Sequence, residues 1–90
     1  MKVLKIGAVW CSGCLIMKPR WKEVEQDNSW LETEYIEYDD RPEIVEKYNL
    51  QDANLPVFIF LDQNGQEIEK ITGEISKDQI IQKINEYKDN

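Results

Sequence analysis

The segment VWCSGCLIMKPRW, from Val9 to Trp21, contains the only two cysteines of the chain. Cys11 and Cys14 are three positions apart and follow an apolar run directly, and Pro19 comes five positions after Cys14. This spacing is compatible with half of a metal site, a structural crosslink, or two thiols that oxidise and reduce reversibly. The composition and the other residues of the chain distinguish between these three interpretations.

Length and composition describe one globular domain. A chain of 90 residues is too short to divide into two domains, and with 41% hydrophobic and 32% charged residues it is too apolar to be disordered. We therefore expect a single domain over residues 1–90. Their 18 acidic and 11 basic side chains give a formal charge of -7. Such a surface repels phosphate groups and anionic lipid. Nucleic acid and membranes are therefore not expected partners, and we expect a monomer.

The amino-terminal run MKVLKIGAVW lacks the features of an export signal. Lys5 interrupts its apolar residues, and no small-residue cleavage site follows before the cysteines. No segment contains the roughly 20 apolar residues that cross a bilayer. We therefore expect a cytoplasmic protein. In that reducing compartment, paired cysteines serve redox or metal chemistry more often than a permanent crosslink.

The residues on either side of the cysteines predict a strand and then a helix. Residues 3–9 form a mostly apolar, partly β-branched run, typical of a strand covered on both faces. The helix should start at Cys11 or Ser12 and extend to about Asp27, with Pro19 inside it removing one backbone donor. Three apolar side chains at helical spacing form its inward stripe: Met17, Trp21 and Val24.

The remaining residues predict two further helices and three strands. Residues 33–38 alternate as a strand does, and residues 40–50 predict a short helix with Asp40 and Glu43 at capping-box spacing. Residues 57–61 and 66–71 predict a hairpin, joined by a type I′ turn at Asn64-Gly65, with the second strand at the sheet edge. Ser76 and Gln79 have the spacing of a second capping box at the start of the last helix. The inner face of that helix consists of Ile80, Ile81, Ile84 and Tyr87.

The resulting order, β-α-β-α-β-β-α, defines the fold class. A leading βαβ unit requires a parallel pair of strands, whereas the hairpin adds antiparallel ones. We therefore expect an α/β fold with a four-stranded mixed sheet and helices on both faces. The thiols would lie where a strand ends and a helix begins, the edge at which open α/β sheets usually place their chemistry.

The metal and crosslink interpretations fit this chain poorly. A structural zinc site needs four ligands, and the chain has no histidine and no third cysteine, so only two chains together could complete one. A crosslink between Cys11 and Cys14 closes a very small loop and constrains the unfolded chain little. We expect no metal and no cofactor other than a redox-active disulfide between these two residues.

The redox interpretation uses the position of the thiols at a helix start. Residues at i and i+3 there lie close enough for a disulfide. Cys11 faces the unpaired amide groups and the positive end of the helix dipole, which favour a thiolate over a thiol. Cys14 lies one turn further in and should be more shielded. Cys11 would attack a substrate disulfide, and Cys14 would resolve the mixed disulfide.

Four features, taken together, resemble the thioredoxin family. Trp10-Cys11-Ser12-Gly13-Cys14 resembles its W-C-x-x-C motif, Pro19 its helix-kinking proline, Leu55-Pro56 its cis-proline, and Gly73 its glycine beside the substrate groove. The resemblance covers nearly the whole chain but lacks the family's additional N-terminal β-α unit. It implies a thioredoxin fold, a cis Pro56 and a protein-disulfide reductase that works in electron transport and cell redox homeostasis.

The resemblance also implies site residues and partners. Substrates would be disulfide-containing proteins, and a thioredoxin reductase would supply electrons. Support for the two thiols would come from Trp10, Ser12, Gly13, Pro19, Pro56 and Lys5. The substrate groove would contain Tyr38, Asn54, Leu55, Thr72, Gly73 and Glu74, although Tyr38 and Trp10 are equally compatible with core aromatics that have a polar edge.

Lys5 stands where the family usually has a buried aspartate, thought to deprotonate the resolving thiol. Lys5 would either favour a thiolate through its charge or extend past the sheet end into solvent. Two alternative functions stay open. One is a binding module with this fold and inert or regulatory thiols, and the other is a glutathione-dependent, glutaredoxin-like enzyme.

Overall fold

Seven helices and strands form in the predicted order. The computed structural model describes residues 1–90, with elements β1 (Lys2–Gly7), α1 (Ser12–Asp27), β2 (Glu32–Glu37), α2 (Pro42–Lys47), β3 (Val57–Leu61), β4 (Glu67–Thr72) and α3 (Lys77–Tyr87). Each agrees with the sequence-based prediction to within a few residues. The main difference in length concerns α2, which has six residues and not the predicted eleven; β1 ends at Gly7, so that Val9 lies outside the strand and is 78% exposed.

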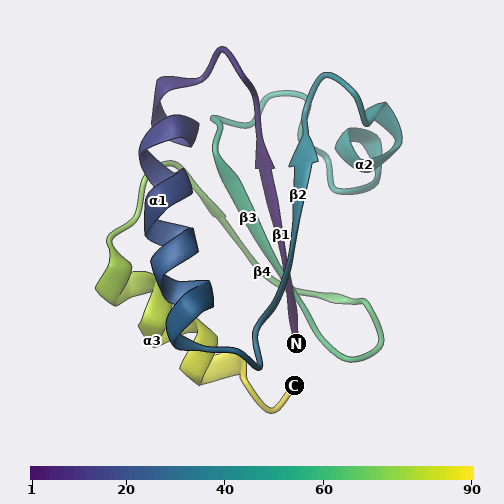
Figure 1. The fold of residues 1–90 in the computed structure, drawn as a ribbon. Coiled ribbons are helices and arrows are strands. Elements are labelled where there is room, and N and C mark those ends of the chain that lie inside the picture. The colour runs from purple at the N-terminus through teal and green to yellow at the C-terminus, as the bar shows by residue number, and fades with distance from the viewer.

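The four strands form one mixed sheet in the order β2-β1-β3-β4 (Figure 1). β1 pairs in parallel with β2, with Gly7 opposite Glu37, and in antiparallel with β3, with Lys5 opposite Phe58. The β3–β4 hairpin is antiparallel and leaves β4 at the edge, as predicted. The two central strands therefore join the βαβ unit to the hairpin, and β1 ends and β3 begins at the end of the sheet next to the cysteines.

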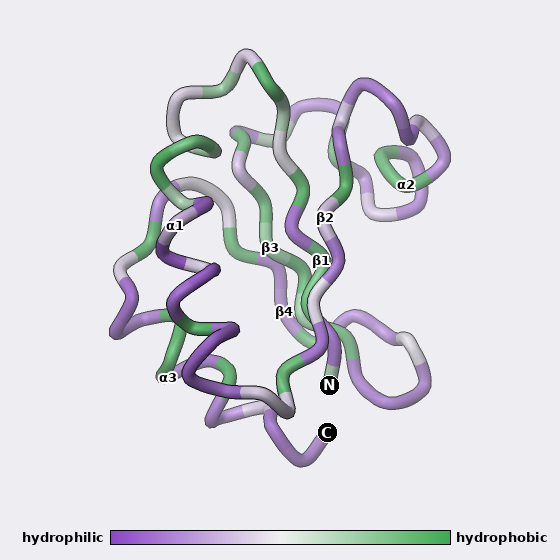
Figure 2. The backbone as a smooth tube through the Cα atoms, viewed as in Figure 1, coloured by the Kyte–Doolittle hydropathy of each residue, from purple (hydrophilic) through white to green (hydrophobic).

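Helices cover both faces of the sheet: α1 and α3 pack on one and the short α2 on the other (Figure 1). Because successive side chains of a strand point to opposite faces, Val3 and Leu4 of β1 enter different cores. Apolar residues accordingly follow the inner strands, whereas hydrophilic residues predominate along the later part of α1 (Figure 2). The core under α1 and α3 consists of Val3, Met17, Trp21, Val24, Phe58, Phe60, Ile75, Ile80 and Ile84. The core under α2 consists of Leu4, Ile6, Ile36, Val45, Tyr48, Leu50, Val57, Ile59 and Leu61.

Of the two predicted capping boxes, the structure contains the one at α3 and lacks the one at α2. Ser76 and Gln79 form the expected capping box at α3. The predicted box of Asp40 and Glu43 at α2 is wrong, because the N-cap is Arg41, which makes no capping bond with its side chain. Glu43 is instead held by Arg41, whose Nε lies 2.6 Å from a Glu43 carboxylate oxygen.

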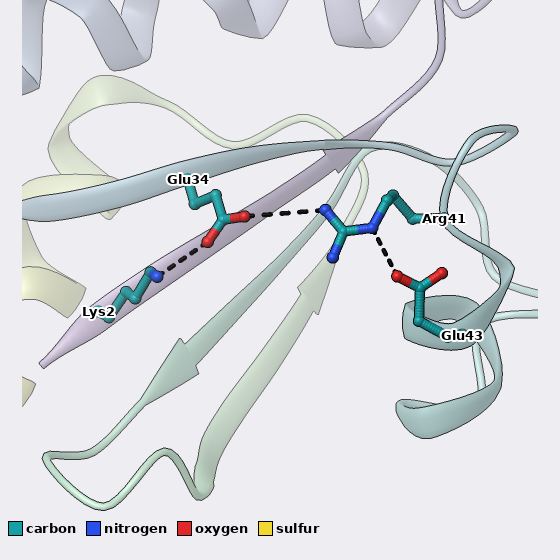
Figure 3. A network of polar contacts seen from close by, with 4 residues as sticks. All are labelled: Lys2, Glu34, Arg41 and Glu43. Atoms are coloured by element: carbon teal, nitrogen blue, oxygen red, sulfur yellow. Dashed lines mark hydrogen bonds and ion pairs between the residues drawn. The ribbon is translucent and has the colours of Figure 1, made fainter.

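Arg41 also belongs to a chain of polar contacts at the outer strand β2. Figure 3 shows this chain of contacts, which runs from Lys2 through Glu34 and Arg41 to Glu43. The Lys2 ammonium lies 2.8 Å and the Arg41 guanidinium 3.9 Å from the Glu34 carboxylate. Exposed pairs of this kind stabilise a fold little. Their charges on an edge strand do discourage pairing with a strand of another chain.

The turn between β3 and β4 is not the predicted type I′ turn. That turn needs positive φ at both central residues, but only Gly65 has it, at φ 80. The Asp62 carboxylate instead accepts hydrogen bonds from the amides of Asn64 and Gln66, at 2.8 and 3.0 Å. A side chain therefore organises this turn in place of a second left-handed residue.

No helix of this fold is both long enough and apolar enough to cross a membrane.

Replacing Ile84 by alanine should lower the free energy of unfolding by about 2–5 kcal/mol, because the removed atoms leave a cavity between α3 and the sheet. Ile84 is 0% exposed. Urea denaturation of both proteins measures the difference. Ile16→Ala is the control: Ile16 is 47% exposed on α1, and its loss should cost no more than about 0.5 kcal/mol. Equal losses in the two variants would contradict the packing described for α3.

Candidate active site

Cys11 is the N-cap residue of α1. Its backbone is extended, at φ -96 and ψ 114, and its sulfur accepts a hydrogen bond from the amide of Cys14 at 3.2 Å. The amide of Cys11 itself donates to the carbonyl of Ala8 at 3.1 Å, which fixes the turn between β1 and the helix. The sulfur of Cys11 therefore occupies the place of a capping oxygen, facing the amide groups that a helix leaves unpaired.

The exposure of the two cysteines is the reverse of the prediction. Cys11 is buried, with 9% of its surface exposed, whereas Cys14 is half-buried. Both thiols are free. The reason lies at Gly7, the last residue of β1: a Cβ there would come within 3.2 Å of the Cys14 sulfur. Because glycine has no Cβ, no side chain from this position covers Cys14.

The pKa of Cys14 is raised to about 11. Burial is the largest cause, followed by the hydrogen bond with Cys11, and the charge of Glu37 raises it further. The backbone of Ala8 acts in the opposite direction. Cys14 therefore remains a thiol at neutral pH.

The Leu55–Pro56 peptide bond is cis, as the resemblance implies. A Cβ at Gly13 would lie 3.3 Å from the Pro56 ring and 3.5 Å from the Glu74 side chain, so the proline packs closely on the segment between the cysteines. Gly73 has a positive φ of 88, and its amide donates to the Pro56 carbonyl at 2.7 Å. Four residues that are distant in sequence thus meet beside the thiols.

The other expected groove residues are not all part of this contact. Trp10 is 64% exposed, with its indole nitrogen 2.8 Å from a carboxylate oxygen of Asp39. Tyr38 packs against the core under α2, and its hydroxyl lies 3.4 Å from two backbone carbonyls, so it is a core aromatic with a polar edge. Leu55 is half-buried against the same core, whereas the remaining expected residues are exposed: Ser12, Asn54 and Thr72. Pro19 lies inside α1.

Lys5 does not extend into solvent. Its side chain is only 19% exposed, and its ammonium lies 2.6 Å from the Glu25 carboxylate, which also accepts a hydrogen bond from the Thr33 hydroxyl at 3.0 Å. The same ammonium is 5.9 Å from the centre of the Trp21 ring. The charge of Lys5 is therefore compensated by α1 and is not directed at the thiols.

A cavity of about 180 Å³ lies between β1 and α1 and reaches the Cys14 thiol. Lys5 and Trp21 lie at its inner wall, and Gly7, Leu15 and Tyr35 also line it. Tyr35 donates a hydrogen bond at 2.8 Å to Glu37, whose other oxygen accepts one from the amide of Val9 at 3.3 Å. Sequence reasoning missed Gly7, Tyr35 and Glu37, although the glycine at the strand end and the parallel register of β1 with β2 were signals for them.

The residues include no group of three or more histidine, cysteine, aspartate or glutamate side chains placed to hold a metal ion. The site thus consists of two thiols at a helix start, faced by a cis-proline loop at one end of a mixed sheet. That combination of fold and site defines a thioredoxin-like protein.

The sequence model of the thioredoxin family matches residues 1–86, and the chain belongs to this family. It is 28% identical to thioredoxin H7 of Arabidopsis thaliana over 86 residues, covering 96% of this chain and 64% of that one. It is 32% identical to thioredoxin H5 of rice over 71 residues, covering 79% of this chain and 50% of that one. The chain therefore spans between half and two thirds of the length of these two relatives.

Solved structures agree on the fold. Thioredoxin NaTrxh from Nicotiana alata has a TM-score of 0.85 at 24% identity, covering 96% of this chain and 71% of that one. Thioredoxin 1 from Thermosipho africanus has a TM-score of 0.80 at 23% identity, covering 97% and 93%. At these identities the likeness concerns the thioredoxin fold alone.

The high pKa of Cys14 predicts slow alkylation at neutral pH. In the reduced protein, the initial rate at which iodoacetamide modifies Cys14 should reach half its maximum near pH 11, because only the thiolate reacts. Peptide mapping by mass spectrometry separates Cys14 from Cys11. In guanidinium-unfolded protein the midpoint should return to roughly 8.5. A midpoint in the folded protein at or below the unfolded one would contradict the assignment.

Proposed function

We propose that this protein is a thiol–disulfide oxidoreductase that reduces protein disulfides by a dithiol mechanism. The observation that carries the proposal is the Cys11 sulfur at the N-cap of α1, which accepts the amide of Cys14. An N-terminal amide and the helix dipole stabilise a sulfur that carries negative charge. Family membership supports the same class of reaction.

The mechanism uses the two cysteines in turn. The Cys11 thiolate attacks one sulfur of a substrate disulfide, and the other substrate sulfur leaves with the electron pair of the broken bond. Cys14 then loses its proton and attacks the Cys11 sulfur, which releases the second substrate sulfur. The substrate gains two electrons, and the protein ends with a Cys11–Cys14 disulfide as its only redox centre, without metal or cofactor.

The cis-proline loop is the proposed place for the substrate chain. Pro56 packs on Gly13 beside the thiols, and the preceding residues Asn54 and Leu55 leave backbone groups available for an extended segment. Thr72, Gly73 and Glu74 would border the same segment. A thioredoxin reductase in the cytoplasm is the proposed electron donor, because a reducing compartment keeps such a dithiol active.

A thioredoxin-fold binding module is the second candidate. The observation in its favour is a group of exposed apolar side chains around the site, with Val9 at 78%, Trp10 at 64%, Leu15 at 58% and Ile16 at 47%. Such a patch suits a protein partner whether or not electrons are exchanged. A glutathione-dependent enzyme, the third alternative, would turn over with glutathione alone.

Insulin reduction with dithiothreitol tests the proposal. Cys11→Ser should lower the rate to that of dithiothreitol alone, because the attacking sulfur is lost, whereas Ser12→Ala keeps both thiols and should retain activity. Cys14→Ser should trap substrates as mixed disulfides, visible on non-reducing gels. Activity in Cys11→Ser would exclude the mechanism. Absence of any trapped species, together with partner binding that survives loss of both thiols, would favour the binding module.

A further inference from the structure

The resolving step needs an acceptor for the proton of Cys14. In the reduced protein, where the pKa is about 11, only roughly one Cys14 in ten thousand is ionised at pH 7; burial, the largest cause of the raised pKa, remains in the mixed disulfide, whereas the contributions of the Cys11 thiol are lost. A neutral thiol does not attack the Cys11 sulfur, so the release of substrate depends on removing this proton. Lys5, which lines the same cavity as Cys14, has no acceptor oxygen.

The Glu25 carboxylate beside Lys5 is not placed for this task. One of its oxygens is bonded both to the Lys5 ammonium and to the Thr33 hydroxyl. Glu25 is also not among the charges that raise the pKa of Cys14, whereas Glu37 is. Lys18, the other charged residue on the cavity wall, is a cation and has no acceptor either.

Tyr35 borders the cavity together with Cys14. A Cβ placed on Gly7 would be 3.2 Å from the Cys14 sulfur and also 3.2 Å from Cε1 of Tyr35, the ring atom next to the one that carries the hydroxyl. The thiol and the phenol edge therefore face the same small volume over Gly7. This volume is open because glycine occupies the last position of β1.

The Tyr35 hydroxyl is hydrogen-bonded to a carboxylate. It donates to Glu37 at 2.8 Å, and the amide of Val9 donates to the second Glu37 oxygen at 3.3 Å, so both carboxylate oxygens are bonded to residues that line the cavity. Burial, followed by the hydrogen bond and charge of Glu37 and the charges of Cys14 and Cys11, raises the pKa of Tyr35. Tyr35 therefore keeps a proton and can accept another only while passing its own to Glu37.

We propose that the Tyr35–Glu37 pair accepts the proton of Cys14 when the mixed disulfide is resolved, an inference that rests on the proposed function. The thiol proton goes to the Tyr35 oxygen as the phenol proton goes to the Glu37 carboxylate. The Cys14 thiolate then forms the S–S bond with Cys11, and the substrate sulfur leaves with the electron pair of the broken bond. Glu37, which is half-buried, later returns its proton to solvent.

Stopped-flow reaction of the reduced protein with the chromogenic disulfide dithiobis(nitrobenzoate) separates the two steps. The first thionitrobenzoate is released when Cys11 attacks, and the second when Cys14 closes the disulfide. Glu37→Gln and Tyr35→Phe should each slow the second phase at least tenfold at neutral pH and leave the first phase unchanged. Glu25→Gln is the matched control, which removes a carboxylate bonded to Lys5 and Thr33 and not to Tyr35, and should leave both phases within about twofold.

The pH profile distinguishes proton transfer from a structural role of Glu37 in the Val9 loop. The deficit of both variants should shrink as the pH rises toward the pKa of Cys14, because hydroxide then replaces the acceptor. A deficit that is constant with pH would overturn the inference. A second phase that is unchanged in either variant would also overturn the inference. A faster second phase in Glu37→Gln would overturn it too, because Glu37 would then act only through the repulsion of its charge. Absence of the first phase would instead contradict the proposed function itself.

Discussion

The structure depends on the hydrogen bond between the Cys11 sulfur and the Cys14 amide at the start of α1. It gives the helix a cap and the sulfur an electrostatic partner at once, so the same contact that begins the helix also prepares the thiol. The contact is held in place by β1, whose buried residues Leu4 and Ile6 fix the end of the strand, and by the bond from Cys11 to Ala8. Packing of the central strand therefore determines the geometry of the chemistry.

Most of the fold could be predicted from local patterns in the sequence. Alternation and helical spacing located every element, since burial imposes those periods directly, as in Met17, Trp21 and Val24 of α1. The failures involve choices between neighbouring polar groups. At α2 the N-cap is Arg41 and not Asp40. At the hairpin, the Asp62 carboxylate accepts hydrogen bonds from two backbone amides, and Asn64 does not adopt the left-handed conformation. Several local solutions of similar energy exist at such positions, and tertiary contacts select one.

The cysteines themselves could be identified from sequence, but their surroundings could not. Spacing and helix position marked Cys11 and Cys14, whereas their exposure depends on what β1 and β2 bring alongside. Gly7 leaves Cys14 uncovered, and the parallel register places Glu37 opposite this glycine. The partner of Lys5, Glu25, comes from α1 and is twenty residues away. Contacts between such distant segments leave no periodic signal in a single sequence.

The unequal covering of the sheet has a consequence for motion. On one face, α1 and α3 together contribute five buried side chains, whereas on the other a six-residue helix contributes Val45 as its buried residue. Segments with few buried contacts open locally at a lower free energy than the rest of a domain. The α2 face would therefore exchange its amide hydrogens with solvent first, while the helix that carries the thiols stays folded. Partial opening of this protein would leave its dithiol intact.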